Sequence, residues 1–140
     1  MRNETAEFQE FTKNLTEAPS GIPAIPGMVS VEECKYLYTV TSSIYAGKGD
    51  VVEIGSWLGK SANYLAAGIA KSGHNRKLHC FDDFQWTAVH SKKASKKGYW
   101  ENHSQIMPGE NFLSHFEANT ARYKNYIIPH KTYIKDIEWI

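Results

Sequence analysis

The sequence predicts an α/β fold built on a parallel β-sheet with flanking helices. Residues 51–54 are a short β-branched run of the kind found in buried parallel strands, and Gly55 interrupts it. A pattern of helical period follows from about Lys60 to Gly73, and residues 78–81 form a second short apolar run. A strand, a glycine turn, a helix and a second strand in this order are the opening of a doubly wound sheet.

The region before the first strand contains one clear helix signal. Ser30 and Glu33 form the S-x-x-E pattern of a capping box, and apolar residues follow at helical spacing until Gly47 provides a stop. We expect a short amphipathic helix over residues 4–17. The connector at residues 18–27 holds three prolines and two glycines, which exclude a helix or a central strand there.

The region after the second strand is less regular. We expect a third helix to follow Pro108 and Gly109. A third strand is expected at residues 126–128 or across residues 131–134, with Pro129 as an interruption.

The length of 140 residues fits one domain. Residues 1–27 are assigned to the N-terminal helix and connector, and residues 28–140 to the N-terminal part of a Rossmann-like cofactor-binding domain. Three strands with their helices do not make a parallel sheet that is covered on both faces, and strands this apolar leave an edge open. We therefore expect either a larger domain or a second chain, for example in a homodimer that forms through the open sheet edge.

Composition and charge exclude several classes of function. The chain carries 16 basic and 15 acidic side chains, and this formal net charge of +1 points neither to nucleic acid nor to an anionic membrane. No stretch approaches the roughly 18 apolar residues of a membrane-spanning helix, and the N-terminus lacks the apolar core of a signal peptide. Cys34 and Cys80 lie in apolar runs that suit reduced thiols. We expect a cytoplasmic protein.

The glycine turn after the first strand predicts a ligand site. Glycines let a ligand approach the backbone, and free N–H groups at a helix N-terminus attract a carboxylate or another anion. An acidic side chain at the end of the next strand lies on the same rim and can accept hydrogen bonds from ribose hydroxyls. Gly55, Gly59 and Asp82 therefore predict a nucleoside-containing ligand at the C-terminal ends of the first two strands. A turn that serves only the fold is the alternative interpretation.

Spacing separates the ligand classes that use this geometry. A dinucleotide fingerprint needs G-x-G-x-x-G, whereas Trp57 stands where its second glycine is required. A P-loop is closer, because residues 59–61 read GKS and the second strand ends in an aspartate. That motif needs four residues between its glycines, and only three separate Gly55 from Gly59. A P-loop-like nucleotide-binding enzyme is the competing interpretation.

The segment VEIGSWLGKSANYLA, followed by CFDDF, resembles the class I S-adenosylmethionine-dependent methyltransferases. More narrowly, it is similar to the small-molecule O-methyltransferases related to macrocin O-methyltransferase and to catechol-type enzymes. The similarity covers residues 28–84 well and residues 109–135 loosely. It implies S-adenosylmethionine as cofactor and a small-molecule acceptor such as a sugar or natural product. The residues that carry it are Glu53, Gly55, Ser56, Gly59, Ser61 and Asp82.

The resemblance implies roles for the residues around the turn. Gly55 and its neighbours Ser56 and Trp57 form the wall against the methionine part of the cofactor, and Glu53 faces that part from the strand end. Ser61, at the start of the helix, contacts the methionyl carboxylate. For Glu53 the alternative is a buried acid satisfied by backbone N–H groups. For Trp57 it is a partly exposed hydrophobic plug.

The resemblance also assigns the residues after the second strand. Asp82 becomes the acceptor for the ribose hydroxyls, and Asp83 and Phe84 lie near the adenine. Because side chains alternate along a strand, Asp82 and Asp83 cannot both face one ribose.

The implied chemistry is transfer of a methyl group from a sulfonium by an S_N2 displacement, in which the enzyme aligns the nucleophile, the methyl group and the leaving sulfur. In relatives, the next strand and its loops supply the acceptor pocket, any base and the carboxylates for a divalent metal. These would lie beyond residue 140, so we name no catalytic residue and no metal ligand. A third interpretation is a non-catalytic, truncated nucleoside-binding module.

Overall fold

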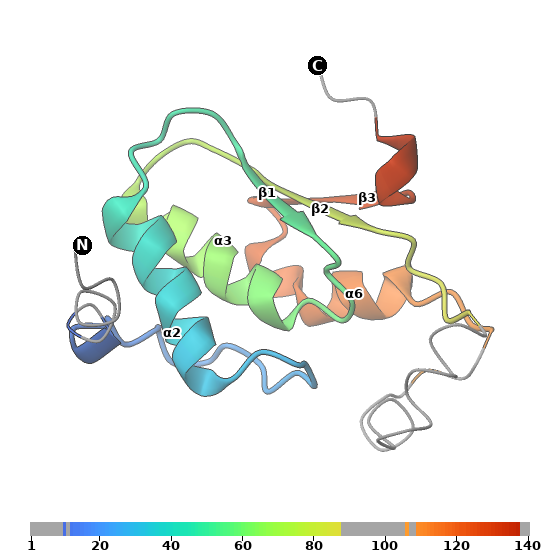
Figure 1. Ribbon diagram of the computed structural model, residues 1–140, viewed down its shortest axis with the longest axis horizontal. Coiled ribbons are helices and arrows are strands. Elements are labelled where there is room, and N and C mark those ends of the chain that lie inside the picture. The colour runs from blue at the N-terminus through green and yellow to red at the C-terminus, as the bar shows by residue number, and fades with distance from the viewer. Residues whose placement is uncertain (1–9, 11, 88–105, 107–108, 138–140) are drawn as a thin grey trace, which may run out of the picture.

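The computed structural model describes residues 10, 12–87, 106 and 109–137, which form a parallel sheet with helices packed on one side (Figure 1). The strands are β1 (Val51–Ile54), β2 (Leu78–Asp82) and β3 (Ile127–Lys131), in the order β1-β2-β3. Both strand pairs are parallel. The predicted α/β class is confirmed, and the arrangement is consistent with a Rossmann-like sheet.

Helix α2 (Val31–Thr39) begins at the predicted capping box. The Ser30 hydroxyl accepts a hydrogen bond from the Glu33 amide at 3.1 Å, and the Glu33 carboxylate accepts one from the Ser30 amide at 2.7 Å. The helix continues as a π-helical stretch, η1 (Val40–Ile44), and ends before the predicted stop at Gly47. The hydrogen bonds of the cap therefore fix the start of this helix more sharply than the glycine fixes its end.

Helix α3 (Lys60–Ser72) lies beneath the sheet and packs against α2 and η1. Its inward side combines two bulky residues, Leu65 and Ile69, with the small residues Ala62 and Ala66, and all four are buried. Small residues between large ones let neighbouring helices approach closely. The helix predicted from about Lys60 to Gly73 is confirmed.

The chain between β2 and β3 contains α6 (Leu113–Asn119) and a 3-10 turn, η2 (Ala121–Tyr123). Strand β3 runs through Pro129, which corrects the expected interruption at that residue. Among the described residues β3 pairs only with β2, so it is an edge strand there. An edge strand accepts proline because an N–H on its outer side has no partner to lose. A second 3-10 turn, η3 (Ile134–Asp136), follows it.

The two faces of the sheet differ in burial. Leu78, Cys80 and Ile127 face the helices and are 0%, 0% and 7% exposed. Val52 and Ile54 point to the opposite face and are 46% and 50% exposed. Helices α3 and α6 lie on the first face, whereas the short turn η3 lies on the other side of β3 (Figure 1). The hydrophobic core therefore lies between the sheet and α3 and α6.

The connector at residues 18–27 packs onto this core. Ile25 is buried within it, and the Arg122 guanidinium donates a hydrogen bond to the Ser20 carbonyl at 2.9 Å. The helix expected over residues 4–17 falls mostly outside the described residues, and Leu15 lies beyond the short helical turn that is seen. Within the described ranges, no helix has both the length and the apolar character needed to cross a bilayer.

Candidate functional site

Gly55 and Gly59 bound the turn between β1 and α3, and they serve different purposes. Both have left-handed backbone conformations, with φ of +81° and +89°. A Cβ added at Gly55 would meet no atom within 4 Å, so this residue borders open space. A Cβ added at Gly59 would lie 2.5 Å from Thr120 Cγ2 and 3.1 Å from the Phe116 ring. Gly59, predicted as a cofactor contact, is therefore a packing residue, and Gly55 is the residue on the open side.

Asp82 holds the glycine turn in place from the end of β2. Its Oδ2 accepts a hydrogen bond from the Trp57 amide at 2.8 Å, and its Oδ1 accepts one from the Phe84 amide at 2.8 Å. Trp57 and Phe84 have positive φ values of +42° and +48°, which side-chain-bearing residues seldom adopt. Burial raises the pKa of Asp82, and the two amide hydrogen bonds lower it in part. Asp82 thus stabilises two strained backbone positions.

Asp83 is the more available carboxylate of the pair. Both oxygens of Asp82 already accept an amide, so a ribose would have to share them. Asp83 accepts one amide hydrogen bond within the described residues, through Oδ1 from the Gln85 amide at 3.1 Å. Its carboxyl also interacts with that of Asp82 through a side-chain hydrogen bond, which contributes to the raised pKa of Asp82. The two carboxyls therefore form one acidic rim, with Asp83 as its open member.

Glu53 places a buried carboxyl beneath the turn. Along β1 it alternates with two exposed residues, and so it faces α3. Burial raises the pKa of Glu53, and the neighbouring Ser61 hydroxyl offsets part of this rise. The Cys80 thiol donates weakly to Glu53 Oε2 at 3.5 Å. The partners of Glu53 among the described residues are thus side chains, not the backbone N–H groups of the alternative interpretation.

The N-terminus of α3 opens beside the same turn. No side chain caps this 13-residue helix, so its first N–H groups and the positive end of its dipole are available to a ligand. The Lys60 ammonium donates to the Val29 carbonyl at 2.7 Å, which ties the connector to the start of the helix. The positive end of the site is therefore the N-terminus of α3, because the Lys60 ammonium is already hydrogen-bonded to the Val29 carbonyl.

Two hollows meet at Gly55. One, of about 240 Å³, lies between residues 27–29, the glycine turn and the start of α3. The other, of about 190 Å³, lies between the ends of β1 and β2 and residues 132–134, with Asp82 and Asp83 in its wall. Each is smaller than the roughly 300–1,000 Å³ of a typical small-molecule site, whereas the two together fall within that range.

Six of the nine predicted cofactor residues line these hollows, and three do not. Glu53 is buried beneath the turn, and Gly59 lies behind it. Phe84 is fully buried, and its ring packs against Phe112 and Phe116 at centroid distances of 5.8 and 5.0 Å. Its position beside an adenine is therefore not supported. The residues that line the hollows as predicted are Gly55, Ser56, Trp57, Ser61, Asp82 and Asp83.

The Trp57 side chain lines its hollow while being almost entirely buried. It is 7% exposed and belongs to the hydrophobic core. This burial agrees better with the plug interpretation than with a ring that stacks on a ligand.

Sequence reasoning missed the contribution of two segments. Met28 and Val29, which follow the connector, line the first hollow, and Thr132 and Tyr133 after β3 line the second. The Thr132 amide donates to the Asp82 carbonyl at 2.9 Å, which brings this segment to the acidic rim. Residues 132–134 reach the rim because β3 pairs in parallel with β2 and ends at Lys131. The sequence did not decide where β3 ends, so it could not place these residues.

Comparisons of the chain with protein-family models, with curated proteins and with solved structures find no match. The described residues also contain no group of three or more His, Cys, Asp or Glu side chains placed to hold a metal ion. What the site offers chemically is a cationic helix end, a buried carboxyl and an acidic rim around one open glycine. This arrangement can bind and orient an extended ligand with an amino-acid end and a hydroxyl-rich end.

Proposed function

We propose that the chain binds S-adenosylmethionine across Gly55 and is the cofactor-binding part of a methyltransferase that acts on a small molecule. The observation that carries this proposal is that two hollows of different chemistry meet at a glycine with open space above it. An adenosyl amino acid has two ends of different chemistry joined at one sulfur. A cytoplasmic location, expected from the sequence, belongs to the same proposal.

The amino-acid end of the ligand suits the hollow beside α3. Its carboxylate would interact with the uncapped helix N-terminus, as anions commonly do. Its ammonium would offset the burial of the Glu53 carboxyl, whose raised pKa marks an acid that lacks a charged partner. Ser61 lies between these two groups, since it lines the hollow and bonds Glu53.

The adenosine end suits the second hollow. Asp83 accepts one amide hydrogen bond and Asp82 accepts two, so we assign the main ribose contact to Asp83, with Asp82 as the residue that fixes the turn. Ile54, Phe81 and Tyr133 supply apolar and aromatic surface in the same wall for the base.

The bound cofactor would supply an activated methyl group for displacement by an acceptor nucleophile. The residues of this chain would bind and align it, which is most of what such a displacement requires from a protein. The P-loop-like alternative is less well supported, because the Lys60 ammonium that would have to face a phosphate is bonded to the Val29 carbonyl.

Calorimetric titration of S-adenosylhomocysteine into the full chain tests the proposal. We expect binding by the wild type and a loss of about tenfold in affinity for Asp83→Asn, because the amide loses the charge and one acceptor for ribose. Glu117→Gln, on the exposed side of α6, is the matched control and should bind like the wild type. A wild type that does not bind S-adenosylhomocysteine, but is stabilised by ATP with magnesium, would favour the P-loop-like alternative.

A further inference from the structure

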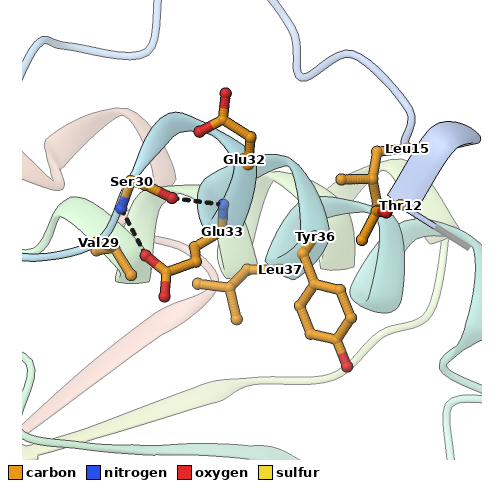
Figure 2. Close-up of a pocket in the computed structure, with 8 residues that line it drawn as sticks. All are labelled: Thr12, Leu15, Val29, Ser30, Glu32, Glu33, Tyr36 and Leu37. Carbon is orange, nitrogen blue, oxygen red and sulfur yellow. Dashed lines mark hydrogen bonds between the residues drawn. The ribbon is translucent and has the colours of Figure 1, made fainter. Parts of the chain in front are cut away.

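A cavity of about 650 Å³ lies along α2, outside the glycine turn. Its volume is within the range of about 300–1,000 Å³ that small-molecule sites occupy. Val29 and Ser30 lie at one end and Thr12 and Leu15 at the other, with the side chains of α2 between them (Figure 2). A cavity of this volume can hold one ring-sized molecule with a short side chain.

The wall of this cavity is apolar with a single sign of charge. Leu15, Leu37 and the Tyr36 ring supply apolar and aromatic surface, and the charged residues in the wall are Glu32 and Glu33. Aromatic ligands gain from packing on a tyrosine ring, and cations gain from both the ring face and the carboxylates.

The lining residues of this cavity include two acids and no base, although Lys60 and Lys35 lie near enough to act electrostatically on Glu33 and Glu32. Glu32 makes no hydrogen bond or ion pair with another described residue, whereas the nearby Lys35 ammonium is paired with Glu17. The Glu33 carboxylate accepts from the Ser30 amide, and this bond lowers the pKa of Glu33, so the group is ionised at neutral pH.

We propose that this cavity binds a small amphipathic cation, with an apolar ring against Leu37 and Tyr36 and a protonated amine beside Glu32. Apolar surface alone would accept a neutral molecule equally well. The two carboxylates select a positive charge over a neutral or negative one.

The position of the cavity links it to the glycine turn. Val29 lines both the cavity and the hollow beside Gly55. Val29 therefore stands between the cavity and that hollow, and binding of the cation does not depend on the proposed function.

Three matched probes test the inference: 2-phenylethylamine, 2-phenylethanol and 3-phenylpropionate, each titrated into the full chain while amide chemical shifts are followed. We expect the amine to bind about fivefold more tightly than the alcohol, as one partly solvated charge pair allows, and the anion to bind most weakly. The shifts should centre on residues 29–37. Glu32→Gln should remove the preference for the amine, and Glu117→Gln, outside the cavity, should keep it.

A second variant tests the apolar part of the cavity. Thr12→Trp places a large ring at the end opposite Val29 and should weaken binding of all three probes without changing their order. Equal binding of the amine and the anion, shifts centred elsewhere, or a Glu32→Gln variant that still prefers the amine would overturn the inference. Since S-adenosylhomocysteine is titrated separately, failure there with intact amine binding would remove the proposed function and leave this site standing.

Discussion

The two faces of the sheet carry side chains from the same three strands, yet they have opposite surroundings. On the helix-covered face, Leu78 and Cys80 are fully buried. On the other face, Val52 and Ile54 are about half exposed, and His79 and His130 lie side by side with 2.8 Å between Nδ1 and Nε2. The covered face supplies the packing that holds the strand ends in register. The site at those ends draws on both faces, because Ile54 and Phe81 of the open face line the second hollow.

The comparison extends to the titratable groups of the two faces. On the covered face, burial raises the pKa of the Glu53 carboxyl. On the open face, partial burial and the neighbouring His79 lower the pKa of His130. In both cases the uncharged form is favoured, as expected where charge is taken out of water. Stability should therefore respond to pH in opposite directions at the two positions.

The largest contrast is expected from truncating one residue on each face. Leu78→Ala should lower the free energy of unfolding by about 2–5 kcal/mol, because it leaves a cavity among well-packed side chains. Val52→Ala should cost about 1 kcal/mol or less, since that side chain is already half exposed. Urea denaturation of the two variants measures both values. Similar losses would mean that another part of the molecule covers the open face in solution.

Gly59→Ala should give the next largest loss, about 2–4 kcal/mol. The new Cβ has to adopt a positive φ and also meets Thr120 at 2.5 Å. Gly73→Ala is the matched control, because Gly73 has a φ of +75° with nothing within 4 Å, and it should lose only about 1 kcal/mol. Thermal unfolding compares the pair, and equal losses would show that Gly59 has no packing role.

Glu53→Gln should stabilise the protein at neutral and alkaline pH. The raised native pKa means that the unfolded carboxyl ionises first as pH rises above its ordinary value of 4.5, so wild-type stability falls through that window. Glutamine stays neutral and removes this fall, while the two proteins should be similarly stable below the window. Denaturation across the pH range measures the difference. A variant less stable than the wild type at neutral pH would show that the ionised carboxyl is well satisfied.

The smallest effect is expected at His130 on the open face. Its native pKa lies below the ordinary value of 6.5, so the unfolded state binds a proton first as pH falls, and wild-type stability decreases below that value. His130→Gln should show a shallower decrease between about pH 6.5 and pH 5. Because Glu53 acts in the opposite direction, the difference between the two proteins is the informative quantity. An unchanged slope would mean that His130 does not titrate across folding.

The sequence predicted the elements whose signals are local. Residues 51–54, the capping box at Ser30 and Glu33, and the helix that begins at Lys60 lie where the patterns placed them. Strand β3 was uncertain because Pro129 disfavours a strand unless that strand is at an edge, and edge position is a property of the whole sheet.

The sequence predicted where the residues of the site lie in the chain, but not which atoms each of them contacts. Motif spacing located Gly55 and Asp82, but it could not tell that the Asp82 carboxylate bonds the Trp57 and Phe84 amides. It also could not tell that Gly55 borders open space whereas Gly59 packs against Thr120, because Thr120 lies 61 residues beyond Gly59 in the chain. Contacts between distant segments decide which residues of a motif face a ligand.

The affinity of S-adenosylhomocysteine for Gly55→Ala, compared with Gly73→Ala, tests the central claim most directly. The two substitutions impose similar backbone strain and meet no protein atom, so they differ mainly in what lies above the new methyl group. If the ligand crosses Gly55, calorimetry at a temperature where both variants are folded should show at least a roughly tenfold loss for Gly55→Ala and wild-type affinity for Gly73→Ala. Equal affinities for the two variants would contradict a ligand seated over Gly55.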